Sequence, residues 1–156
     1  MAVTYVAAGA AGAASVTSAT AALIGLYQPA SATMAGSRIS QMMVGPGANS
    51  ADETYSVRMR RATTAASTWT TAITPSCTGP TASTSTALAG SASTARATLT
   101  AGNVGIWGFH MRGGMAWTAI PGGEQQLLYV FNAGLELEYF FAQGTSVLEA
   151  TYMFQE

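Results

Sequence analysis

The sequence contains very little charge. Only 8% of its 156 residues are Asp, Glu, Lys or Arg, and lysine does not occur at all, whereas soluble domains average roughly 25% charged residues. The formal net charge is −1, which excludes the broad cationic surface that nucleic-acid binding requires. A freely diffusing monomer normally keeps a charged surface that prevents copies from associating. The composition therefore favours a subunit whose surface is largely covered by neighbours.

Cysteine and histidine each occur once, as Cys77 and His110. A single cysteine excludes an internal disulfide and any multi-cysteine metal site, and it suits synthesis in a reducing cytoplasm. No segment reaches the about eighteen consecutive apolar residues that a membrane-spanning helix needs, so we expect no membrane partner. The apolar segment Met1–Leu26 has no preceding Lys or Arg, which argues against a cleaved signal peptide.

The first 36 residues are dominated by small side chains. Alanine favours helix, but Gly9, Gly12 and a Ser/Thr-rich spacer interrupt the alanines and weaken a helical prediction. We therefore expect residues 1–36 to form an N-terminal arm, either as a helix or as an extension that becomes ordered against a neighbouring subunit.

From Arg38 onward the pattern is typical of β-structure. Tyr55, Val57 and Met59 alternate with polar residues, which is the period of a half-buried strand. Further strands are predicted at residues 39–44, 68–74, 106–112, 115–120, 126–132, 134–141 and 146–155. The low-complexity residues 75–101 predict a surface excursion or a weak edge strand, and the last third of the chain is expected to hold the core.

Many short strands with frequent turn signals predict a single β-sandwich domain over residues 37–156. The predicted fold class is thus all-β, a jelly roll or a related β-sandwich, with an Ala-rich N-terminal arm.

The residues that could carry chemistry are few. His110 has no Gly-x-Ser-x-Gly nucleophile motif to work with. Glu136 and Glu138 lie two apart on one strand, hence on one face and about 7 Å apart, but the sequence offers no further ligands for a cation. We expect these carboxylates to be solvated or to meet arginines across a subunit boundary. Asp52 and Glu53 are expected to be solvated loop charges, and no catalytic, metal or cofactor residue is predicted.

Arg58, Arg60 and Arg61 form the densest charge cluster. They could bind phosphate, pair across strands with Glu136 or Glu138, or anchor an interface; the last two are favoured because three arginines alone bind nucleic acid weakly. Large or adaptable apolar side chains commonly supply the remaining interface contacts. The predicted interface residues are Arg58, Arg60, Arg61, Trp107, Trp117, Met42 and Met43.

Four segments together resemble a known family. They are residues 53–65, 70–75, 108–117 and 120–124, followed by a final β-segment that ends in an acidic residue. This layout resembles the cement or decoration proteins of tailed-bacteriophage capsids. The resemblance implies a jelly-roll or β-sandwich module without catalytic residues, which assembles as a homotrimer on the outside of the shell.

The expected function is therefore that of a structural virion protein on the capsid surface. It would oligomerise and stabilise adjacent subunits of the major capsid protein, without binding nucleic acid. An alternative is a tail, head-fibre or adhesin-like β-module that binds carbohydrate or a host surface. A cupin-like enzyme is disfavoured because cupin metal sites use several histidines, and this chain has only His110. Fold alone does not decide among these functions.

Overall fold

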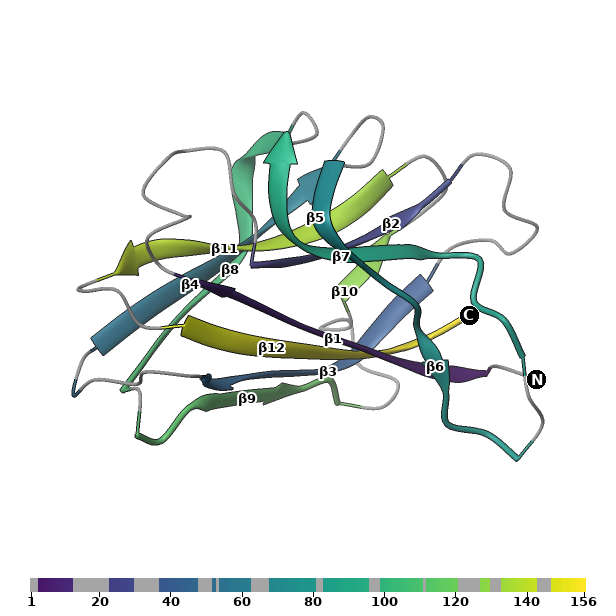
Figure 1. The fold of residues 1–156 in the computed structure, drawn as a ribbon, viewed down its shortest axis with the longest axis horizontal. Coiled ribbons are helices and arrows are strands. Elements are labelled where there is room, and N and C mark those ends of the chain that lie inside the picture. Colours follow the sequence, from purple (N-terminus) through teal and green to yellow (C-terminus); the bar gives the residue numbers. More distant parts are fainter. Residues whose placement is uncertain are drawn as a thin grey trace.

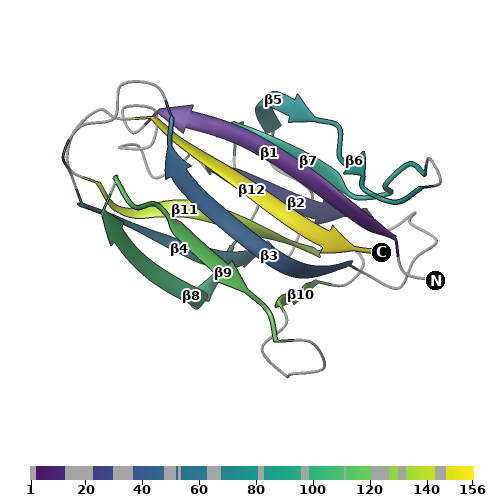
Figure 2. The same cartoon turned by 90° about the horizontal axis from the view of Figure 1, so that it is seen from below.

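The computed structural model is an all-β sandwich (Figures 1 and 2). The parts of the chain that it describes are residues 3–12, 23–29, 37–47, 52, 54–62, 68–80, 83–95, 99–110, 112–120, 127–129, 133–142 and 147–156. Two antiparallel sheets face each other across one core, and the described residues contain no helix. The predicted β-sandwich is thus confirmed.

The first sheet, sheet A, is built around the two ends of the chain. Its strand order is β10 (Leu127–Tyr129), β3 (Ser37–Pro46), β12 (Val147–Gln155), β1 (Thr4–Gly12) and β6 (Ser76–Cys77), with β9 (Met115–Thr118) also pairing with β3. The second sheet, sheet B, has the order β5 (Thr68–Ile73), β7 (Leu88–Ala95), β2 (Ile24–Gln28), β11 (Ala133–Ala142), β4 (Thr54–Ala62) and β8 (Leu99–His110).

The core follows from the period-2 patterns of the strands. On β12 the side chains of Leu148, Tyr152 and Phe154 are fully buried, as their alternation with more polar residues predicts. Aromatic rings link the strands within each sheet: Tyr5 stacks on Phe154 with ring centroids 5.6 Å apart. In sheet B, Tyr55 lies 6.0 Å from Tyr139 and 6.4 Å from Phe109. Such pairs add stabilisation beyond the area that they bury.

The prediction of an N-terminal arm over residues 1–36 is wrong for the part that the structure describes. β1 lies inside sheet A between β12 and β6, and β2 lies inside sheet B between β7 and β11. Tyr5, Ala7 and Ile24 are buried core residues, so the core is not confined to the last third of the chain. Tertiary pairing overrides the weak helical preference of alanine.

The small residues of β1 serve close packing between the two sheets. A Cβ added to Gly9 would lie 2.7 Å from Ile73 Cδ1 and 2.8 Å from Ser91 Cβ. Both of those residues belong to sheet B, on β5 and β7. Gly9 therefore lets the sheets approach at a point where any side chain would push them apart.

The interpretation of residues 75–101 as a surface excursion or edge strand also needs correction. The segment Leu88–Ala95 is β7, which pairs with β2 on one side and β5 on the other, so it lies inside sheet B. Its composition matches that position because Ala89 and Ser91 are small enough to be buried where β1 packs close.

We expect Gly9→Ala to lower the free energy of unfolding by about 1–3 kcal/mol, the usual cost of overpacking a core. Urea unfolding of the full chain measures this. Gly45→Ala is the matched control, since Gly45 is also a strand glycine but has open space around its Cβ position. Equal stability of the two variants would contradict the close approach at Gly9.

Candidate functional site

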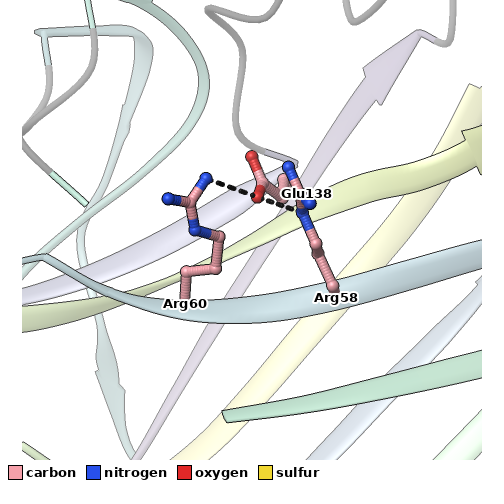
Figure 3. Close-up of polar contacts among 3 residues, drawn as sticks. All are labelled: Arg58, Arg60 and Glu138. Carbon is pink, nitrogen blue, oxygen red and sulfur yellow. Dashed lines mark hydrogen bonds and ion pairs between the residues drawn. The ribbon is translucent and has the colours of Figure 1, made fainter. Parts of the chain in front are cut away.

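An ion-pair cluster lies on the outer face of sheet B. β4 and β11 are antiparallel neighbours, and their register sets Arg58 opposite Glu138 and Arg60 opposite Glu136. These positions alternate with the core residues Met59 and Leu137, so the charged side chains project from the other face of the sheet. Figure 3 shows Arg58 and Arg60 converging on Glu138 from the neighbouring strand.

Glu138 accepts two contacts from the arginines. Arg58 Nε lies 2.5 Å from Glu138 Oε1, and Arg60 Nη1 lies 3.5 Å from the same oxygen. The Glu138 side chain is only 3% exposed, whereas Arg58 and Arg60 are 28% and 20% exposed. Cross-strand pairing, one of the predicted roles of these arginines, is thus confirmed within a single chain.

The expectation that Glu136 and Glu138 are solvated or meet arginines of another subunit is wrong. Each is 2% exposed, although both lie on the face of β11 opposite the core residues Leu135 and Leu137. A buried carboxylate needs compensating partners, and for Glu138 the two guanidinium groups supply them. The cluster neutralises its own charge, which gives it a structural role.

The same strand carries a buried phenol on its core side. Tyr139 packs near Tyr55, and desolvation by burial raises the pKa of its hydroxyl well above the usual value for tyrosine, with the nearby Tyr55 adding to the effect. β11 thus presents neutral groups to the core and charged groups to the opposite face.

The other predicted interface residues lie in different parts of the sandwich. Met42 is fully buried in the core, so its assignment to an interface is wrong; the alternation of β3 turns Met42 inward and Met43 outward, where it is 41% exposed. Trp107 and Trp117 are half-buried and pack against the core. Arg61 is exposed near the end of β4. The seven residues therefore do not form one continuous surface.

A second polar cluster joins the start of β4 to the end of β8. His110 Nε2 lies 2.9 Å from Asp52 Oδ1, and Arg112 Nη2 lies 3.2 Å from Asp52 Oδ2. The backbone N–H of Arg112 donates to His110 Nδ1 at 3.3 Å, so both ring nitrogens have partners. Thr54 pairs with His110, and this pairing brings Asp52 near the ring. Asp52 is exposed as predicted, whereas Glu53 lies outside the described residues.

A third cluster, which sequence reasoning missed, surrounds Glu156. Its carboxylate accepts hydrogen bonds from the backbone N–H groups of Thr86 and Ala87 at 3.0 and 2.9 Å, and from Ser85 Oγ at 2.9 Å. Ser37 Oγ lies 3.5 Å from the same carboxylate and donates to Gln28 Oε1 at 3.0 Å. The network joins β3 of sheet A to β2 of sheet B, so it links the two sheets at one end of the sandwich.

Within the described ranges, no three His, Cys, Asp or Glu side chains are grouped closely enough to hold a metal ion. That part of the chain also contains no helix long and apolar enough to cross a membrane. Comparisons with protein-family models, with curated proteins and with solved structures gave no match for this chain.

We expect Glu138→Gln to lower the free energy of unfolding by about 3 kcal/mol, because it removes the charge of the buried carboxylate that both partly buried arginines contact. Glu149→Gln is the control: Glu149 is an exposed carboxylate on β12, and surface changes usually stay within about 0.5 kcal/mol. Thermal and urea unfolding of both variants measure the difference. A Glu138 variant as stable as the Glu149 variant would show that the buried pair is not needed.

Proposed function

We propose that this protein is a structural virion protein. In this proposal it oligomerises and binds the outside of a tailed-bacteriophage capsid, where it stabilises adjacent subunits of the major capsid protein. The low charge of the chain and its resemblance in layout to capsid decoration proteins support this role, and one feature of the surface carries it.

That feature is an uncharged area on the outer face of sheet A, here called the neutral face. Its residues come from four adjacent strands, β1, β12, β3 and β9, and the strand registers align them in two rows. One row contains Ala8, Thr151, Met43 and Ala116, and the other contains Val6, Met153, Gln41 and Thr118. Met43, Ala8, Ala116 and Thr118 are exposed.

The neutral face is suited to being covered by another protein. Covering it desolvates no charged group, which avoids the main cost of burying polar surface. Its small side chains allow close approach, and the flexible side chain of Met43 adapts to an irregular partner. In a shell, many such contacts act together, so each can be weak.

Charges of opposite sign flank the neutral face. Arg38 lies at one end of β3, opposite Gln155, and Glu149 lies near the other end of the sheet, opposite Gly45. Both side chains are exposed. Such an arrangement favours one orientation of a partner over the reverse, because it fixes which end of the partner must be acidic.

The carbohydrate-binding alternative gains less support from the surface. Such modules present aromatic rings to solvent, since the apolar face of a ring packs against a sugar. Trp107 and Trp117 instead pack partly against the core. We therefore favour the assembly role over an adhesin-like module.

The first test is the mass of the full chain in solution by size exclusion with light scattering. The family resemblance implies a homotrimer, and we expect Met43→Glu to weaken self-association at least about tenfold, because it would bury an unpaired charge. Leu88→Glu is the control, since Leu88 is 50% exposed but belongs to sheet B. A strictly monomeric wild-type chain that also fails to bind capsids would contradict the proposal.

A further inference from the structure

β1 is paired along its full length on one side only. β12 pairs with Thr4–Gly12, whereas β6 pairs only with Tyr5 and Val6. Among the described residues, no strand pairs with Ala7–Gly12 on the β6 side. This stretch of β1, together with its backbone groups, is here called the open edge.

The hydrogen bonds at the start of β1 fix which backbone groups face the open edge. Val3 and Glu156 exchange both backbone hydrogen bonds, at 3.0 and 3.1 Å, so odd-numbered residues point to β12. The Thr78 N–H donates to the Thr4 carbonyl at 2.9 Å, so even-numbered residues point the other way. By this alternation the N–H and C=O groups of Ala8 and Ala10 face the open edge.

The described residues of the open edge lack three common protections against added strands. Exposed edges are normally blunted by charges, proline or bulges. Ala7–Gly12 contains no charged residue and no proline, and its register with β12 is unbroken.

Sheet B extends past the open edge and limits what can bind there. Across the core, β1 lies mainly over β7, and β5 is the next strand outward; Figure 2 shows β5 projecting beyond β1. Thr71 and Ile73 of β5 share the core-facing side with Ser91 and Ala89 of β7. Thr71 is nevertheless exposed and Ile73 only half-buried. Solvent therefore reaches these two side chains of β5 beside the open edge.

The projection of β5 beyond β1 determines which kind of partner can bind at the open edge. If β1 of a second copy paired with the open edge, that copy's own sheet B would have to occupy the layer that β5 already fills. A single extended segment has no second layer behind it and avoids this clash. Five residues beside Ala8–Gly12 would span about 17 Å.

We infer that the open edge binds an extended, uncharged segment of the major capsid protein as an added antiparallel or parallel strand of sheet A. The inference rests on the proposed function for the identity of the partner. Backbone hydrogen bonds to Ala8 and Ala10 would supply affinity, and side chains above Thr71 and Ile73 would complete the core at this corner.

The test uses the full chain and a terminally blocked Thr-Val-Thr-Val-Thr peptide as an uncharged strand probe. We expect the peptide to slow hydrogen exchange at the Ala8 and Ala10 amides, while the amides of Ala7 and Gly9 are protected with or without it. No change at Ala8 and Ala10 with millimolar peptide would overturn the inference, and this result needs no variant.

A substitution at Ala10 tests the open edge without disturbing the pairing of β1 with β12. Ala10→Pro removes an N–H that faces the open edge and leaves the bonds of the odd-numbered residues to β12 intact, a position where strands tolerate proline. Ala10→Val keeps the N–H and is the matched control. We expect the proline variant to bind the peptide and emptied capsids about tenfold more weakly, and the valine variant to bind like wild type.

The capsid assay distinguishes the two proposals. If the wild type binds capsids and Ala10→Pro binds equally well, the inference is wrong and the proposed function stands. If no capsid binding occurs although the peptide protects the edge, the proposed function and the capsid partner are both wrong. A doubling of mass through the open edge, abolished by Ala10→Pro, would show that a second copy is the occupant and would also overturn the inference.

Discussion

The antiparallel pairing of β1 with β12 is the constraint on which the rest of the structure depends. It joins the first and last strands of the chain along nine residues, from Thr4 opposite Gln155 to Gly12 opposite Val147. The pairing places β1 over β7, where only glycine fits at position 9. It also aligns two of the four strands of the neutral face and leaves the open edge beside β5. Both proposed contact surfaces, the neutral face and the open edge, include β1 and therefore depend on this pairing.

Much of the fold could be predicted from the sequence. The strands β1 and β7 could not, and the reason is physical. The strands β4 and β12 were predictable because large apolar residues alternate with polar ones on them. β1 and β7 carry mostly Ala, Gly and Ser, so their buried and exposed faces differ little in hydrophobicity. Their strand structure arises from pairing and close packing with distant segments, which local patterns do not record. The sheet order is likewise set by contacts between residues far apart in sequence.

The candidate functional sites could likewise be predicted from the sequence only in part. Alternating patterns on β4 and β11 were enough to predict that Arg58 could meet Glu138, but they did not predict that Glu138 is buried. Met42 and Met43 are chemically identical, and only the register of β3 decides that one is core and the other surface. The Asp52–His110 pair and the Glu156 network join residues more than fifty positions apart, so no local sequence motif predicts them. These contacts follow from the topology of the sandwich.

The central claim is that the neutral face of sheet A is covered in the assembled state. Cryo-electron microscopy of capsids that lack this chain, imaged with and without the added full-length protein, tests it most directly. The account predicts additional density on the outer surface of the shell, with β1, β12, β3 and β9 turned toward a capsid subunit or another copy. Density that leaves this face open to solvent would contradict it, as would shells that look the same with and without the protein.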